Sequence, residues 1–239
     1  MILDSFRLDG RTALVTGGNR GLGQACARAL SEAGAAVTVL GRKPPTFDTD
    51  FVACDLATAT PAELAAVVDD VRPDILVNNA GVIRRGPAVE VAPADWDEVL
   101  TVDLTAVFHL CQAAGRHMLA AGGGKIINVA SMLSFQGGLR VPAYAAAKHA
   151  VAGLTKALTN EWAAHGVNVN AVAPGYMATD NTSALRGDPA RSAEILARIP
   201  AGRWGTPGDL SGAVVFLASD AARYVHGTIL PVDGGWLAR

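Results

Sequence analysis

A glycine-rich turn, TGGNRGLG at residues 16–23, places the strongest constraint on how this chain folds. It follows a short apolar run, Thr12–Val15, and precedes a stretch with helical character. Glycines at such a strand-to-helix junction let the backbone approach a pyrophosphate, which binds at the helix N-terminus. The spacing of Gly17, Gly21 and Gly23 is GxxxGxG, which differs from the usual GxGxxG. Because a glycine triplet alone is weak evidence, its interpretation depends on the rest of the chain.

Short apolar segments alternate with helical segments along the chain. The expected strands are 12–16, 36–40, 51–54, 74–77, 125–130, 167–172 and 228–232, and the expected helices are 21–33, 61–71, about 95–121, 143–163 and 208–218. This alternation predicts a parallel sheet with helices on both faces. With 239 residues and no linker or repeat, we expect an α/β chain of one domain, residues 1–239, with a Rossmann-like doubly wound parallel sheet.

One unit of this alternation is expected to lack its helix. Only GRKPPTFDTD, residues 41–50, separates the second and third strands, and it contains Pro44 and Pro45. Two adjacent prolines prevent a regular helix. We therefore expect the helix between the second and third strands to be absent or very short, which would leave the adenosine side of a bound dinucleotide more exposed.

The composition excludes several classes of protein. Half of the residues are hydrophobic and 18% are charged, which is typical of a folded globular chain. The net charge of −2 gives no reason to expect nucleic acid or a membrane as a partner, and no apolar run approaches the length of about 20 residues that a membrane span needs. Residues 1–10 lack the apolar core of a signal peptide. The scattered Cys26, Cys54 and Cys111 indicate reduced core thiols, so we expect a cytoplasmic protein without a metal site.

A candidate proton-transfer site lies between Ser131 and Lys148. Tyr144 precedes Lys148 by four residues, so the two side chains share one face if a helix begins there. An ammonium about 4 Å from a phenolate, at an effective dielectric of about 20, stabilises it by roughly 4 kcal/mol, or about three pKa units. Tyr144 would then act as a general acid or base, and Ser131 would steady an alcohol or carbonyl oxygen. A lone YxxxK is common by chance, and the glycine-rich turn is what favours the catalytic interpretation.

Together these motifs resemble the short-chain dehydrogenase/reductase family over essentially the full chain. The matching pieces are TGGNRGLG at 16–23, Asp55 after the third strand, NNAG at 78–81, Ser131, Tyr144, Lys148 and Pro174-Gly175. Within the family, the chain is most similar to the 2-deoxy-D-gluconate 3-dehydrogenase group, also called 2-dehydro-3-deoxy-D-gluconate 5-dehydrogenases. That likeness is carried by residues 78–85, 125–144, 168–182, 191–205 and the C-terminal VDGGWLAR.

The resemblance implies an oxidoreductase that transfers a hydride between NAD(P) and a secondary alcohol or ketone of a sugar acid. It also implies a cofactor site made by Gly17, Asn19, Arg20, Gly21, Leu22, Gly23, Arg42, Asp55, Leu56, Asn79, Ala80, Gly81, Tyr144, Lys148, Pro174, Gly175 and Thr179. By the same resemblance, Asp55 and Leu56 would contact the adenine ring, and Pro174, Gly175 and Thr179 would hold the nicotinamide end. Asp55 taken alone could equally cap a helix.

The residues after the second strand bear on the choice between NAD and NADP. An acid there bonds the ribose 2′-hydroxyl of NAD and repels the 2′-phosphate of NADP. Here Gly41 is followed by Arg42 and Lys43, and Arg20 precedes the second glycine of the motif. Three cations and no acid favour NADP, whereas the resembled group is usually described with NAD. Arg42 and Lys43 could also be solvated loop charges.

A fourth catalytic residue is implied by the resemblance. Many family members carry an Asn on the long central helix that relays protons through a water to the lysine, and Asp103 occupies the corresponding position here. An Asp can accept from a bridging water, but its charge would favour keeping Lys148 protonated. Asp103 could instead be a simple buried hydrogen-bonding group.

Three arginines are candidates for binding the substrate. Arg84 and Arg85 follow NNAG directly, and Arg140 precedes Tyr144 by four residues. Because a guanidinium pairs with a carboxylate in bidentate fashion, we expect Arg85 or Arg140 in particular to hold the carboxylate of a sugar acid, beside Ser131 and Tyr144. Each arginine could also be an ordinary surface charge. Residues 176–203 are polar and helix-prone and interrupt the strand–helix alternation, so we expect a mobile lid over the substrate.

Other functions stay open at this point. The same chemistry could act on another carbonyl, such as a 3-oxoacyl thioester or a steroid, although an aromatic content of 5% argues mildly against a steroid pocket. A nucleotide-sugar epimerase shares YxxxK but needs a longer chain. A catalytically silent NAD(P)-binding protein is opposed by the intact Ser131, Tyr144 and Lys148. The resemblance further implies a homotetramer, in which the apolar stretches 99–120 and 145–162 could pair between subunits.

Overall fold

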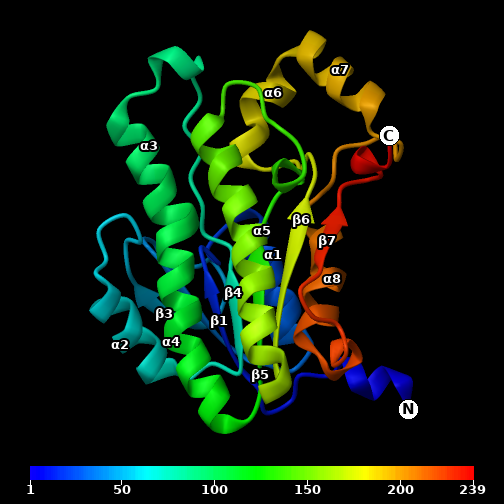
Figure 1. Cartoon of the computed structure of the whole chain (residues 1–239). Helices are drawn as coiled ribbons and strands as arrows, with labels where there is room; N and C mark the ends of the chain where they lie inside the picture. Colours follow the sequence, from blue (N-terminus) through cyan, green and yellow to red (C-terminus); the bar gives the residue numbers. More distant parts are fainter.

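Seven parallel strands form one sheet at the centre of the computed structural model, which describes all 239 residues (Figure 1). The strands are β1 (Thr12–Thr16), β2 (Ala36–Gly41), β3 (Asp50–Ala53), β4 (Ile75–Asn78), β5 (Gly124–Val129), β6 (Val167–Pro174) and β7 (Ile229–Val232). Their order is β3-β2-β1-β4-β5-β6-β7. The chain winds outward in both directions from β1 and β4, so the carboxyl ends of these two strands border a crevice.

Helices cover both faces of the sheet, as expected for a doubly wound fold. They are α1 (Gly21–Glu32), α2 (Pro61–Val71), α3 (Pro93–Leu100), α4 (Ala106–Ala121), α5 (Pro142–Trp162), α6 (Ser183–Gly187), α7 (Pro189–Arg198) and α8 (Gly208–Ala218). One core packs α1 and α8 against the sheet, and a second packs α2, α4 and α5 against the opposite face. The predicted single Rossmann-like sheet is therefore confirmed. None of these helices combines the length and the apolar character that crossing a membrane requires.

The segment between β2 and β3 contains no helix, which confirms the expectation drawn from its two prolines. This open segment, residues 42–49, is held against α1 by two contacts. The Gln24 side chain donates a hydrogen bond to the Thr46 hydroxyl at 2.8 Å, and the Arg28 guanidinium lies 4.6 Å from the centre of the Phe47 ring. The edge strand β3 is thus reached by a loop that follows the surface of α1.

The long central helix is interrupted where the sequence pattern predicted one continuous helix. Residues Thr101–Thr105 form a π-helical turn between α3 and α4. Such a turn widens the backbone by one residue and occurs frequently at functional sites. Asp103 lies in this turn and is fully buried, so the wider backbone places a carboxylate inside the protein beneath the carboxyl end of the sheet.

A two-helix segment interrupts the strand–helix alternation after β6, within residues 176–203. It contains α6 and α7, which lie above the carboxyl ends of the strands (Figure 1). A separate small apolar cluster supports it, formed by Met132, Ile195, Ile199 and Trp236. Because Trp236 lies near the C-terminus, the end of the chain forms part of the base on which α7 rests.

Candidate active site

One cavity of about 1190 Å³ opens at the carboxyl ends of the strands. Its lining comes from the glycine-rich turn, the ends of β2, β4, β5 and β6, the start of α5 and the two-helix segment. Every residue expected to bind the cofactor lines it, namely Gly17, Asn19, Arg20, Gly21, Leu22, Gly23, Arg42, Asp55, Leu56, Asn79, Ala80, Gly81, Tyr144, Lys148, Pro174, Gly175 and Thr179. Residues that are distant in sequence thus share one continuous space.

The glycine-rich turn has the shape and the free donors that a pyrophosphate requires. Gly17 has a φ of +64°, and a Cβ on Gly23 would overlap the Gly17 carbonyl and the Asn79 amide. No side chain caps the N-terminus of α1 at Arg20, and no acid lies in its first turn. The backbone N–H groups there are therefore available to an anion, and the helix dipole favours negative charge. The residues present fit the pyrophosphate of a dinucleotide.

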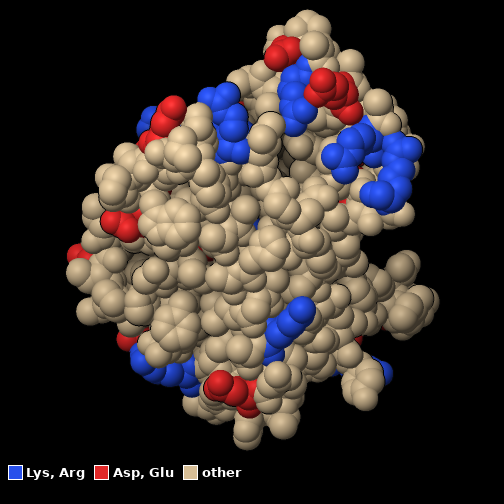
Figure 2. Space-filling view, turned by 45° about the horizontal axis from the view of Figure 1, so that its top comes forward, with Lys and Arg blue, Asp and Glu red and all other residues tan.

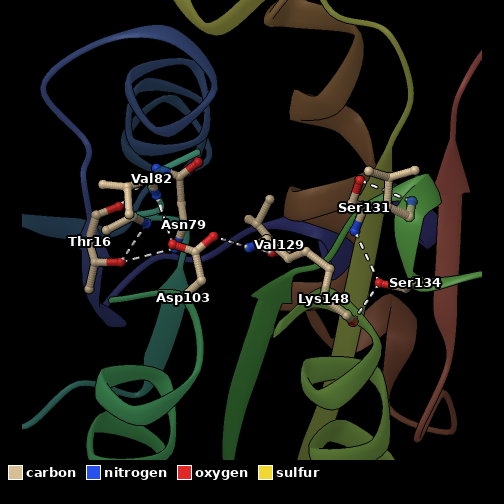
Figure 3. A network of polar contacts seen from close by, with 10 residues as sticks. Thr16, Asn79, Val82, Asp103, Val129, Ser131, Ser134 and Lys148 are labelled. Carbon is tan, nitrogen blue, oxygen red and sulfur yellow. Dashed lines mark hydrogen bonds and ion pairs between the residues drawn. The ribbon is translucent and has the colours of Figure 1, made fainter. Parts of the chain in front are cut away.

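Thr16 fixes the NNAG segment against this turn, a role that the sequence reasoning did not assign. Its hydroxyl accepts the backbone N–H groups of Asn79 at 3.0 Å and Ala80 at 2.9 Å (Figure 3). The Asn79 side chain donates to the Thr16 carbonyl at 2.9 Å and to the Gly17 carbonyl at 3.3 Å. These bonds hold the two halves of the crevice in register.

Ser131, Tyr144 and Lys148 line the same cavity, where β5 ends and α5 begins. The Lys148 ammonium donates to the Val129 carbonyl at 2.8 Å (Figure 3). It lies 5.5 Å from the centre of the Tyr144 ring. The Ser131 hydroxyl accepts the backbone N–H of Leu133 at 3.1 Å. All three groups therefore face the space that begins at the glycine-rich turn.

Ser134 also supports this arrangement and was missed by the sequence reasoning. Its hydroxyl donates to the Lys148 carbonyl at 2.6 Å and accepts the Ser131 backbone N–H at 3.4 Å. Ser134 is buried, and it joins the end of β5 to α5 in Figure 3. The spacing between Ser131 and Lys148 is thus fixed through a third side chain.

The net effect of the surroundings on Tyr144 corrects an expectation. Burial raises the pKa of the Tyr144 phenol, the Lys148 charge lowers it, and the Asp103 charge raises it again. Ser131 and Arg85 lower this pKa by smaller amounts, and the overall direction is upward. The predicted lowering by Lys148 is present, but the desolvation of the phenol outweighs it. Lys148 therefore counteracts burial rather than producing a low pKa by itself.

Asp103 is placed behind Lys148 and does not line the cavity. One carboxylate oxygen, Oδ1, accepts the backbone N–H of Val82 at 2.7 Å, while Oδ2 has no hydrogen-bond partner and lies 3.7 Å from the Lys148 ammonium (Figure 3). Burial raises the pKa of Asp103, opposed by the Lys148 charge, and nearby Glu98 adds slightly to the rise. Asp103 was predicted as catalytic; in the structure its side chain contacts Lys148 and the Val82 backbone and does not reach the cavity.

The three predicted substrate arginines have different surroundings. Arg84 is turned away from the cavity because its guanidinium forms a bidentate pair with Glu98, at 2.7 and 2.8 Å, and lies 3.5 Å from Asp95. The prediction of Arg84 as a substrate ligand is therefore not supported by its position. Arg85 and Arg140 both line the cavity, and Arg85 donates to a backbone carbonyl of the two-helix segment at 3.4 Å.

The cationic side chains expected to bind the 2′-phosphate on the ribose of NADP also line the cavity. Arg42 and Lys43 line it beside Gly41. Arg20 lines it as well and forms an exposed ion pair with Asp180 at 3.0 Å, which joins the glycine-rich turn to the start of the two-helix segment. A bound anion would thus compete with Asp180 for Arg20.

Several further residues of the cavity were not named individually from the sequence, although four of them lie in the expected lid, residues 176–203. At the end remote from Gly41 the lining includes Gln136, Tyr176, Leu185, Arg191, Arg198 and Trp236. The sequence held a signal for two of them, because Arg191 and Arg198 are seven residues apart on a helix and so lie on one face. Trp236 belongs to VDGGWLAR, the C-terminal segment that carries part of the likeness to the sugar-acid dehydrogenase group.

Comparison with known proteins places the chain among dehydrogenases. The family model described as enoyl-(acyl carrier protein) reductase matches residues 17–237. The chain is 53% identical to 2-dehydro-3-deoxy-D-gluconate 5-dehydrogenase of Escherichia coli K12, over all of both chains. It is 51% identical to the protein of the same name from Bacillus subtilis, over 99% of this chain and 98% of the relative.

Two solved structures share the fold closely. A protein from Agrobacterium tumefaciens with bound NADP is 55% identical, with a TM-score of 0.94 over 98% of this chain and 99% of that one. A gluconate 5-dehydrogenase from Burkholderia cenocepacia, in complex with NADP and tartrate, is 42% identical, with a TM-score of 0.95 over the full length of both chains.

Proposed function

Because the chain belongs to the short-chain dehydrogenase/reductase family, we propose that it transfers a hydride between NADP and a sugar acid. The group that reacts is a secondary alcohol or ketone of a substrate of the 2-deoxy-D-gluconate or 2-dehydro-3-deoxy-D-gluconate type. The single observation that carries the proposal is that Ser131, Tyr144 and Lys148 line the same cavity as the glycine-rich turn. The names of the full-length relatives supply the substrate class.

Each residue of the cavity has its own role in the proton transfer that accompanies the hydride transfer. When bound, the nicotinamide ring accepts or supplies the hydride. Tyr144 takes the proton from the alcohol or returns it to the ketone, and Ser131 orients the substrate oxygen. Lys148, held by the Val129 carbonyl, offsets the cost of a buried phenolate. The Asp103 carboxylate pairs with the Lys148 ammonium at 3.7 Å and so helps to fix its position.

The charge of the cavity supports anionic ligands at both ends. Eight cationic side chains line it, against the three acids Asp55, Glu98 and Asp180. Clefts lined by one sign of charge raise the local concentration of oppositely charged ligands. Arg20, Arg42 and Lys43 favour the 2′-phosphate of NADP at one end.

Arg85 and Arg140 serve the acid group of the substrate at the other end of the cavity. A carboxylate pairs with a guanidinium in bidentate fashion. The two-helix segment, residues 176–203, acts as a lid that closes over the substrate. An acyl thioester, the other candidate substrate, brings no carboxylate to the reacting end and so leaves these arginines without a partner.

The assembly and location of the protein follow as further proposals. We propose a cytoplasmic homotetramer, in which faces of α4 and α5 pair between subunits. Phe108 on α4 is partly exposed, which provides apolar surface for such contacts. The mass of the protein in solution, measured by light scattering, tests the proposed assembly.

The absorbance of NADPH, followed with a panel of sugar acids and their keto forms, tests the proposed activity. A matched panel with NADH, a 3-oxoacyl thioester and a neutral polyol separates the alternatives. We expect turnover of a sugar acid with NADP, and a fall in kcat of about 10²- to 10⁴-fold in Tyr144→Phe. Binding of NADP without turnover of any substrate would identify the protein as a silent NADP-binding protein and overturn the proposal.

A further inference from the structure

The inward face of α7 carries two arginines on either side of a buried isoleucine. Arg191, Ile195 and Arg198 follow the i, i+4, i+7 spacing that places side chains on one face of a helix. Ile195 is 2% exposed and packs in the small cluster with Met132 and Trp236, so this face points toward the body of the protein. Both arginines line the cavity.

The guanidinium groups of the two arginines make different contacts within the protein. The Arg191 guanidinium pairs with Glu194, one turn along the same helix, at 2.7 Å. Arg198 has no carboxylate partner; its guanidinium instead lies over the Trp236 ring, 3.9 Å from the ring centre. Stacking on an aromatic ring fixes the plane of a guanidinium while leaving its N–H donors at the edge available.

The neighbourhood of Arg198 contains a second donor without a partner. Trp236 is 4% exposed, lines the cavity, and has no hydrogen-bond partner for its indole N–H. A buried indole N–H usually finds one. Trp236 also packs edge-to-face with Tyr176, with ring centres 4.8 Å apart, so its position is fixed by packing.

The cluster around Trp236 is connected to the end of β5, where Ser131 lies. Met132, which follows Ser131 in the chain, lies in the same cluster as Trp236 and Ile195. The C-terminal residue adds rigidity, because the Arg239 side chain donates to the carbonyls of Ala197 and Arg198 at the end of α7. Figure 2 shows Lys and Arg side chains at the upper right of the molecule, with Asp and Glu side chains among them.

We propose that Arg198, oriented by stacking on Trp236, is a specificity-determining residue that binds the carboxylate of the substrate from the lid. This inference rests on the proposed sugar-acid function and adds a residue to it. Because Arg198 belongs to α7, an ion pair between its guanidinium and the substrate carboxylate holds the lid against the bound substrate. A neutral polyol of the same shape cannot form this ion pair, so Arg198 selects acids over neutral analogues.

The test compares a sugar acid with its neutral amide, in the wild type and in Arg198→Met, with saturating NADP. For the acid, we expect Arg198→Met to raise KM by about 10- to 100-fold, since a hydrogen-bonded charge pair of this kind is lost, and to change kcat much less. For the amide, KM stays the same. Arg198→Lys recovers part of the loss, because an ammonium keeps the charge but not the bidentate fork.

Arg223→Met is the control, since Arg223 is an exposed arginine that does not line the cavity. It should leave both KM values unchanged. The dissociation constant of NADP and the midpoint of thermal unfolding show whether Arg198→Met is folded. If it is not folded, Arg198→Lys is compared with the wild type instead, and we expect its KM to be raised for the acid and unchanged for the amide.

Equal increases in KM for the acid and the amide would show a structural role and overturn the inference. Turnover of the acid with an unchanged KM in Arg198→Met would overturn this inference while leaving the proposed function intact. A wild-type protein that turns over no sugar acid would overturn both.

Discussion

The Asp103 carboxylate lies 3.7 Å from the Lys148 ammonium, and both side chains are buried. This pair places a negative charge behind the residue that steadies Tyr144. It therefore links a π-helical turn in the middle of the long central helix to the proton chemistry of the cavity.

The pH dependence of Asp103→Asn follows from the sign of this contact. Asp103 raises the pKa of Tyr144, in the same direction as burial and against Lys148. Removing the negative charge therefore lowers the pKa of Tyr144. Oxidation of an alcohol uses the deprotonated phenol as a base, so we expect the rising limb of kcat/KM for oxidation to move to lower pH. The pH profile of kcat/KM for oxidation, measured for the wild type and for Asp103→Asn, checks this expectation. A rising limb that stays in place in the variant, or moves to higher pH, would contradict it.

Gly41→Asp should change the choice of cofactor. A Cβ at Gly41 would meet only the Asn19 side chain at 3.9 Å, so an aspartate fits there without displacing the backbone. Its carboxylate would repel a 2′-phosphate, and we expect kcat/KM with NADP to fall at least about tenfold relative to NAD. Gly86→Asp adds the same charge at an open position outside the cavity and serves as the control. An unchanged ratio of the two efficiencies would exclude Gly41 as the position that reads the ribose.

Gly23→Ala should destabilise the protein because the added methyl overlaps the Gly17 carbonyl and the Asn79 amide. We expect a loss of about 1–3 kcal/mol in the free energy of unfolding, measured with urea, together with weaker NADP binding. Gly212→Ala makes the same change on α8, where nothing lies within 4 Å of the new atom. That control should gain about 0.5–1 kcal/mol, since alanine is the better helix former. Equal effects of the two substitutions would refute the close packing of the turn.

The double variant Arg85→Met/Arg140→Met should raise KM for a sugar acid by about tenfold or more and leave KM for a neutral alcohol unchanged, since both guanidinium groups line the cavity. Arg84→Met is the comparison within the same loop. Its pair with Glu98 is partly exposed, so we expect a loss of at most about 1 kcal/mol of stability and no change in KM. If Arg84→Met raised KM as much as the double variant, the assignment of these arginines would have to be reversed.

Much of the fold was predictable because it depends on local patterns. Apolar alternation gave the strands, two prolines gave the missing helix before β3, and the glycine-rich turn with YxxxK marked both ends of the cavity. The direction of Arg84 was not predictable, because it is decided by Glu98, fourteen residues away on α3. Neighbouring arginines in one loop look equivalent until their partners are known.

Two features of the site depend on three-dimensional burial and so escaped the sequence. The net rise in the pKa of Tyr144 comes chiefly from desolvation, which no spacing between Tyr144 and Lys148 reveals. The π-helical turn at Thr101–Thr105 inserts one residue into a stretch that the sequence pattern predicts as one continuous helix. The ion pair of Arg20 with Asp180 joins residues 160 positions apart and likewise needs coordinates.

The uncovered segment between β2 and β3 bears on what limits the speed of catalysis. Of the loop from Arg42 to Thr49, only Arg42 and Lys43 line the cavity, so few contacts with this loop need to break when the cofactor leaves. Cleavage of the carbon–hydrogen bond, and not release of the cofactor, would then be the rate-limiting step. Deuterium on the carbinol carbon of the substrate should therefore lower kcat as well as kcat/KM.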